Sequence, residues 1–247
     1  MIQLARNDWI QFFKQLSGKL GSNIYAGFQG QSTPQNIAFI RQLQKEMKND
    51  NSLETPLYKL KVAVFDIETT GFYPERGDQI ISIGAVKITG PQLHAEETFY
   101  SLVQSNFLLA DEISALTNIH QEDLHTAPAG EDVLLEFFKF THSHLLVAHH
   151  SKHEQAFMQK MSWDLLRTRF EQRIIDTSFL IRLSKPSLKS LALEDVCMDC
   201  KIEIENRHNA LGDAIMTARI WSHYLKHAQK MGFMNLREVY EYIAKLR

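Results

Sequence analysis

Only two cysteines occur in the 247 residues, Cys197 and Cys200, and they form a single C-M-D-C motif. A structural zinc site needs two further ligands and a redox-active pair needs a thioredoxin-like context, and the sequence shows neither. The surrounding apolar residues predict a helix: Leu188, Leu191, Leu193 and Val196. We therefore expect Cys197 to be a small core residue rather than a ligand.

Long apolar runs are also missing, since none approaches the roughly 20 residues that cross a membrane. Met1 opens a mixed polar segment rather than the basic and then apolar start of a signal peptide. These two absences predict a cytoplasmic protein without a membrane partner.

An excess of positive charge is absent as well, because the formal net charge is −2 at pH 7. Proteins that coat a nucleic-acid duplex neutralise many phosphates and carry a basic field. For a nucleic-acid partner, this charge favours local capture of one strand end. With 44% hydrophobic and 23% charged residues, the chain can bury one good core plus an appendage.

Two carboxylates stand at the end of an apolar run in the segment Lys61 to Gly71, KVAVFDIETTG. Side chains alternate along a β-strand, so Asp66 and Glu68 project from the same face, about 7 Å apart along the strand. An edge strand can carry such charges for solubility, but the apolar residues before them indicate a buried strand. We interpret the acids as part of a metal or catalytic site at a strand end, where α/β folds build their sites.

A second segment, LLVAHHSKHEQAF over residues 145–157, predicts a buried strand followed by the start of a helix. Ser151 and Glu154 match the capping-box pattern at that helix start.

A third segment, RHNALGDA, opens an amphipathic helix near the C-terminus. On one helix, residues five positions apart face different directions, so His208 and Asp213 cannot both lie within it and face one site. We therefore place His208 in the loop before the helix, Asn209 at the N-cap and Asp213 in the first turns, facing the site.

Taken together, the three segments resemble the motifs of a known enzyme family. They resemble the three motifs of the DEDDh 3′-5′ exonucleases, which are relatives of the bacterial DNA polymerase III epsilon (proofreading) subunit. The matching segments are Asp66-Ile-Glu68-Thr-Thr-Gly71, VAHHSKHE from Val147 to Glu154, and His208-x-Ala-Leu-x-Asp213. The likeness covers roughly residues 61–225, in the family's order and spacing, with support from LTNIHQEDL (116–124) and IIDT (174–177). It implies an α/β fold of the ribonuclease H-like kind, a mixed sheet flanked by helices.

The second motif departs from the family pattern, which usually reads Val-Ala-His-Asn and then Phe-Asp. Here His150 stands at the Asn, His153 at the Phe and Glu154 at the Asp. Glutamate keeps the charge but carries it one methylene further out, so metal geometry must adjust by about 1 Å. Two interpretations of Glu154 remain open, a metal-shell residue and a helix cap paired with Ser151.

The resemblance implies hydrolysis of phosphodiester bonds with two divalent cations, Mg²⁺ or Mn²⁺. Asp66 bridges the ions in this reading, while Glu68 and Asp213 hold the nucleophile-side ion and its water. Glu154 completes the metal shell. His208 acts as the general base, since an imidazole can take a proton at neutral pH.

In the family, the backbone after the first motif holds the terminal sugar and an apolar residue wedges against the last base. Thr69, Thr70 and Phe72 occupy those places here, and we expect His150 to line the site. Phe72 could equally be a core residue at the turn. The implied activity removes nucleotides from 3′ ends of single-stranded DNA or RNA, with DNA favoured. The alternative is a binding module that keeps the fold with weakened catalysis.

Residues 1–56 form a helical N-terminal extension in this prediction, and residues 57–247 the exonuclease domain. Two apolar helix faces, over 4–20 and 35–47, pack on the domain or bind a protein partner. Within the domain we expect strands over 62–66, 79–88, 95–103, 145–148 and 173–176. Expected helices cover 111–118, 131–141, 152–162, 188–196 and 210–229.

Overall fold

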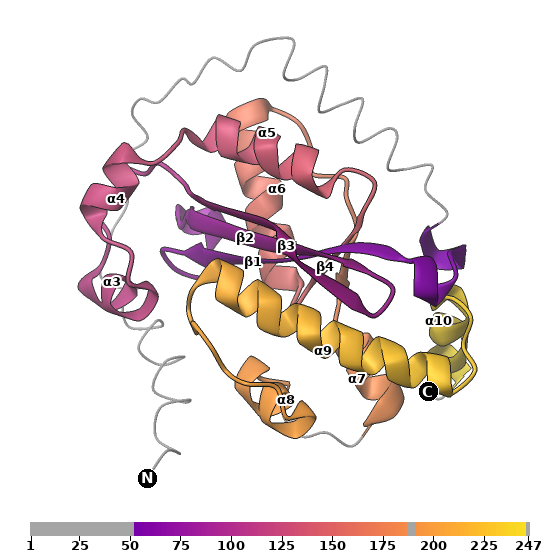
Figure 1. The fold of residues 1–247 in the computed structure, drawn as a ribbon. Coiled ribbons are helices and arrows are strands. Elements are labelled where there is room, and N and C mark those ends of the chain that lie inside the picture. Colours follow the sequence, from indigo (N-terminus) through magenta and orange to yellow (C-terminus); the bar gives the residue numbers. More distant parts are fainter. Residues whose placement is uncertain (1–51, 187–190, 246–247) are drawn as a thin grey trace.

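A five-stranded sheet forms the centre of the structure, a computed structural model that describes residues 52–186 and 191–245 (Figure 1). The strands run in the order β3-β2-β1-β4-β5, with β1 antiparallel to β2 and parallel to β4. Their bounds are β1 (Lys61–Thr69), β2 (Ile80–Thr89), β3 (Gln92–Leu102), β4 (Leu145–Ala148) and β5 (Ile174–Asp176). The predicted mixed sheet is therefore confirmed.

Helices cover both faces of the sheet, with α9 lying across one face and α5 and α6 on the other (Figure 1). The helices are α3 (Asp111–Thr117), α4 (Gln121–Thr126), α5 (Gly130–Thr141), α6 (Lys152–Leu166), α7 (Ser178–Ser184), α8 (Leu193–Cys200), α9 (Ala210–Lys230) and α10 (Leu236–Lys245). Three short 3₁₀ helices are η1 (Ser52–Glu54), η2 (Leu57–Lys59) and η3 (Pro74–Arg76). Among the described residues, no helix combines the length and apolar character needed to cross a membrane.

β1 is the central strand, so the alternative of a solvated edge strand is wrong. Val62 and Val64 face the core beneath α9, whereas Ala63 and Phe65 face the core beneath α5 and α6. A strand that is buried on both faces reads as a continuous apolar run, which is the pattern of its first residues. Further along, the face beneath α9 carries the two acids in place of apolar side chains.

Several predicted elements need correction in the structure. The strand expected over 62–66 is longer, because β1 continues through Glu68 to Thr69. The helix expected over 188–196 begins only at Leu193, because Leu191 and Ala192 are not helical. Helices α4, α7 and α10 were not predicted. Cys197 is buried and both cysteines are free thiols, as expected.

The two predicted N-terminal helices lie outside the described residues. The chain from Leu53 onward already packs on the domain, with Leu57 and Leu60 fully buried in the core beneath α9. Glu54 forms an ion pair with Arg237 of α10. The division at residue 56 stays a prediction, and these contacts place its last residues against the domain.

Candidate active site

Three carboxylates converge where α9 crosses β1. Asp66 and Glu68 project from the face of β1 that α9 covers, and Asp213 lies buried in the first turn of α9. One oxygen of each acid lies within 4.8 Å of an oxygen of each of the others. Two distant segments of the chain thereby form one acidic cluster, which we call the three-acid cluster.

A glycine on β2 allows α9 to come this close. Gly84 pairs with Asp66 in the β1–β2 ladder. A Cβ at this position would lie 2.2 Å from the Leu211 backbone nitrogen and 2.3 Å from the Ala210 carbonyl carbon. The first turn of α9 therefore rests directly on the sheet, and Asp213 reaches the acids of β1.

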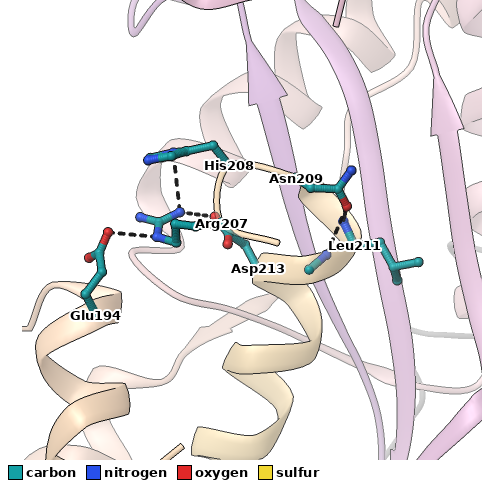
Figure 2. Close-up of polar contacts among 7 residues, drawn as sticks. Glu194, Arg207, His208, Asn209, Leu211 and Asp213 are labelled. Carbon is teal, nitrogen blue, oxygen red and sulfur yellow. Dashed lines mark hydrogen bonds and ion pairs between the residues drawn. The ribbon is translucent and has the colours of Figure 1, made fainter. Parts of the chain in front are cut away.

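The start of α9 is fixed by the predicted N-cap. The Asn209 side-chain oxygen accepts hydrogen bonds from the backbone nitrogens of Leu211 at 3.2 Å and Gly212 at 3.1 Å (Figure 2). His208 lies in the loop before the helix with a left-handed backbone, φ 61°. The placement predicted for His208, Asn209 and Asp213 is confirmed.

The electrostatics of the cluster call for a cation. Burial and the neighbouring carboxylates raise the pKa of Asp66 well above its usual range. Burial first, and then the charge of Asp213, raises the pKa of Glu68 to about 8. Burial raises the pKa of Asp213 to about 6, although the positive charge of Arg207 opposes that rise. Crowded like charges disfavour ionisation unless an opposite charge enters the site.

Glu154 lies in the first turn of α6 and is buried, outside the three-acid cluster. Its negative charge still contributes to the raised pKa of Asp66. Burial and the charge of Asp176 raise the pKa of Glu154 to about 8. Among the described residues, Glu154 Oε2 has no hydrogen-bond partner.

The predicted capping box is wrong, because the Ser151 side chain makes no capping hydrogen bond to α6. Ser151 itself has helical backbone angles, and its N–H donates to Asp176 Oδ2 at 2.7 Å. Asp176, at the end of β5, therefore accepts a hydrogen bond from a backbone N–H at the start of α6. Of the two interpretations of Glu154, the helix cap loses its support.

The carboxylates fit a divalent cation. Buried carboxylate oxygens without a partner in the described chain occur at two of the acids, Asp213 Oδ1 and Glu154 Oε2. Unpaired buried oxygens are costly, and carboxylate oxygens are the ligands that Mg²⁺ and Mn²⁺ prefer.

Comparison with known proteins gives the family. A family model described as Exonuclease (RNase_T) matches residues 63–221, more than half of the chain. The chain belongs to the Exonuclease family. This confirms the resemblance read from the three motifs, and the matched range contains all four acids and His208.

Curated relatives of this exonuclease-family chain include DNA polymerase III proteins. It is 32% identical over 194 residues to the DNA polymerase III subunit epsilon-like protein of Rhodobacter capsulatus, covering 78% of this chain and 27% of that protein. It is 30% identical over 158 residues to the DNA polymerase III subunit epsilon of Aquifex aeolicus, covering 64% of this chain and 77% of that protein. The chain thus spans about a quarter of the length of the Rhodobacter relative.

Solved structures confirm the ribonuclease H-like fold. The nuclease domain of 3′hExo, a DEDDh family member, bound to rAMP, superposes with a TM-score of 0.61 at 21% identity, covering 69% of this chain and 94% of that one. Escherichia coli Exonuclease I in complex with a dT13 oligonucleotide gives a TM-score of 0.59 at 12% identity, covering 70% of this chain and 42% of that one.

The exonuclease-family site also contains an arginine that the sequence reasoning missed. Arg207 forms ion pairs through Nε with Glu194 Oε1 of α8, at 2.7 Å, and through Nη1 with Asp213 Oδ2 (Figure 2). The same Nη1 lies 3.5 Å from His208 Nδ1. The sequence signals only a basic residue beside His208, and its partners depend on how α8 and α9 come together.

His208 is a neutral imidazole at neutral pH. Burial and then the charge of Arg207 lower the pKa of His208 to about 4. A general base must be unprotonated before the reaction, so this state is the one that proton transfer requires.

The predicted substrate residues lie at the end of β1. Thr69 Oγ1 donates to the Gly71 carbonyl at 2.6 Å, and Thr70 Oγ1 accepts from the Gln79 backbone nitrogen at 3.0 Å. Both threonine side chains therefore hold the turn itself. His150 is exposed between β4 and α6, and its ring contacts that of His149 at 4.5 Å between centroids.

Phe72 is not a core residue, because 51% of its surface is exposed. Its ring meets the His153 ring edge to face, with 5.8 Å between centroids. His153 in turn packs against the Phe157 ring at 4.7 Å. The histidine that replaces the family's usual Phe thus supports Phe72 from beneath.

Proposed function

We propose that the chain is a metal-dependent 3′-5′ exonuclease that removes nucleotides from the 3′ end of single-stranded nucleic acid, with DNA favoured. The observation that carries the proposal is the three-acid cluster, with its oxygens within 4.8 Å of one another, in a chain of the Exonuclease family. Hydrolases that cleave phosphodiesters use such clusters to hold metal ions.

Asp66, Glu68 and Asp213 would hold the metal ions, with Glu154 completing the shell. When bound, two divalent cations supply an activated water and stabilise the leaving oxygen. The carboxylates themselves orient these charges, since β1 and the capped first turn of α9 fix the position of each acid.

His208 takes the proton of the attacking water at Nε2, with the single proton of the neutral ring on Nδ1. Its loop position beside Asp213 supports this role, because the loop is fixed at one side by the Asn209 cap. The low pKa of His208 keeps the ring unprotonated across the neutral range.

Phe72 would stack against the terminal base, and the backbone after Glu68 would hold the terminal sugar. An exposed aromatic ring binds any base, so no sequence preference is expected. The net charge of −2 supports capture of a strand end rather than coating of a duplex. DNA is favoured because the sequence relatives are DNA polymerase III proteins.

The test uses the full chain and a variant, Asp66→Asn, that keeps the side-chain volume and removes the charge. Single-stranded DNA and RNA, labelled at the 5′ end, are incubated with Mg²⁺, Mn²⁺ or excess EDTA. We expect mononucleotide release from the 3′ end that needs metal and Asp66, faster on DNA. Full activity in EDTA, or products that start at the 5′ end, contradicts the proposal. Strand binding without cleavage in Mn²⁺ identifies the weakened binding module.

A further inference from the structure

We propose that Arg207 is a tethered cation that offsets part of the negative charge of the three-acid cluster without metal and must release Asp213 before a divalent ion binds there. The inference deepens the proposed function and rests on it. It makes Arg207 a positioning residue that sets how tightly the site binds metal.

The guanidinium of Arg207 has one partner inside the cluster and one outside. Nη1 pairs with Asp213, whereas Nε pairs at 2.7 Å with Glu194, which lies on α8 (Figure 2). The two contacts use different donors of the guanidinium, so a rotation about the Nε contact with Glu194 would break the contact with Asp213 alone. Release from Asp213 would leave the side chain held near the site by Glu194.

Arg207 and a divalent ion compete for the same carboxylate. Asp213 Oδ2 accepts from Arg207, and Asp213 Oδ1 has no hydrogen-bond partner in the described chain. A metal ion held by Asp213 together with Asp66 and Glu68 would lie beside the guanidinium of Arg207. Two positive charges that are neighbours in a buried site repel strongly. Arginine does not lose its proton in proteins, so it must move rather than become neutral.

The ion pair between Arg207 and Asp213 is largely shielded from solvent, so it should contribute to stability. The Asp213 side chain is 5% exposed and that of Arg207 27%, whereas most exposed ion pairs contribute little. Without Arg207 the metal-free cluster would bring three acids together with no partner cation among the described residues.

The same movement would prepare His208. A neutral imidazole carries one proton, and the donor Nη1 at 3.5 Å from Nδ1 favours the form with that proton on Nε2. Proton transfer to Nε2 requires the other tautomer, with the proton on Nδ1. Withdrawal of Arg207 toward Glu194 therefore adjusts Asp213 and His208 in one step.

The experiment measures Mn²⁺ binding to the full chain by calorimetry, together with the melting temperature in EDTA. Arg207→Gln should bind Mn²⁺ at least about fivefold more tightly than the wild type, because it removes the competing charge. The same variant should melt at a lower temperature without metal. Glu194→Gln should weaken Mn²⁺ binding, since Arg207 then keeps Asp213 as its ion-pair partner.

Arg219→Gln is the matched control, because it removes the same charge from an exposed ion pair that Arg219 of α9 forms with Glu205. It should leave Mn²⁺ binding unchanged. Should Arg207→Gln not fold, Arg207→Met keeps a long unbranched side chain without the competing charge, and a tighter Mn²⁺ affinity is again expected. Unchanged or weaker Mn²⁺ binding in the folded Arg207 variant overturns the inference alone. Absence of Mn²⁺ binding in the wild type overturns the proposed function and this inference with it.

Discussion

Gly84 lies opposite Asp66 in the β1–β2 ladder, and the backbone of α9 fills the space that a side chain at Gly84 would need. The approach of Asp213 to Asp66 therefore depends on a residue that carries no chemistry. Because the clash would be with backbone atoms, no rotamer change can relieve it.

Gly84→Ala is expected to displace the first turn of α9 and to destabilise the fold by about 3 kcal/mol. Mn²⁺ binding and nuclease activity should fall together, since Asp213 moves away from β1. Gly130→Ala is the matched control, because its added methyl meets side chains and no backbone: the flexible ends of Leu165 and Met161, at 2.8 and 3.3 Å, and Val103 at 3.5 Å. Urea unfolding and calorimetry on both variants check the prediction, and a fully active Gly84→Ala protein would contradict it.

Glu154 should act through its charge rather than as a cap. Glu154→Ala is expected to lower the rate by orders of magnitude, while Glu154→Asp keeps or raises it. Glu154→Gln keeps the volume and should leave metal-free stability unchanged or higher, because the lost charge is buried and its Oε2 has no hydrogen-bond partner in the described chain. Lys152→Ala, an exposed change in the same turn, is the control. Near-full activity of Glu154→Ala would leave three carboxylates and His208 to carry the site.

The ring beneath Phe72 should matter for its packing and not for its nitrogen atoms. His153→Phe restores the usual family residue and is expected to keep activity, because the edge contact with Phe72 and the contact with Phe157 persist. His153→Ala and Phe72→Ala should both raise KM for a short single strand several-fold, with a smaller change in kcat. Steady-state kinetics separate the two parameters. Equal losses in His153→Phe and His153→Ala would instead indicate a chemical role for the imidazole.

His149 makes the fold sensitive to acid. Its Nε2–H donates to the Leu191 carbonyl at 2.6 Å, and its Nδ1 lies 2.6 Å from Thr177 Oγ1. Burial lowers its pKa from 6.5 to about 4. Between these values the unfolded chain binds more protons than the folded one, so stability is lost as the pH falls from about 6.5 to about 4.

The loss due to His149 is on the order of 3 kcal/mol over that range. His149→Gln keeps a polar side chain without a titrating group, so its stability should depend less steeply on pH. Urea unfolding at about pH 7.5 and about pH 5 measures the difference. His153 and His208 remain in both proteins, so the wild-type minus variant difference isolates His149. If the stability of the wild type and of the variant changed equally with pH, a group other than His149 would be responsible for the acid sensitivity.

The domain should work without the N-terminal extension. A chain that begins at Ser52 keeps the Glu54–Arg237 ion pair and the buried Leu57 and Leu60, so we expect it to fold and to cleave single strands. A chain that begins at Lys61 loses both leucines from the core and should be destabilised by several kcal/mol. Melting temperatures and activity on both chains test this. A folded but inactive chain from Ser52 would mean that residues 1–51 shape the substrate path.

The sequence predicted the acids well because two local rules place them. Period-two alternation sets Asp66 and Glu68 on one face, and the Asn209 cap fixes where the helix of Asp213 begins. Helix α10 was predictable too, since Leu236, Val239, Tyr240 and Ile243 follow the helical spacing.

Non-local contacts account for the failures. Ser151 has the right neighbours for a capping box, yet Asp176 from the next strand takes the Ser151 N–H. Arg207 was missed because its partner Glu194 comes close only when α8 packs beside α9. Helix α7 has only seven residues, about two turns, which is too short for its sequence to show a helical period.

The position of α9 late in the chain has a consequence during protein synthesis. Asp66, Glu68 and Glu154 leave the ribosome well before His208 and Asp213, which belong to the same site. A nascent chain therefore carries an incomplete set of ligands beside the messenger RNA that encodes it. Only when α9 settles against Gly84 are the last acid and the imidazole in place, so the site of the proposed exonuclease would be assembled only once the fold is complete.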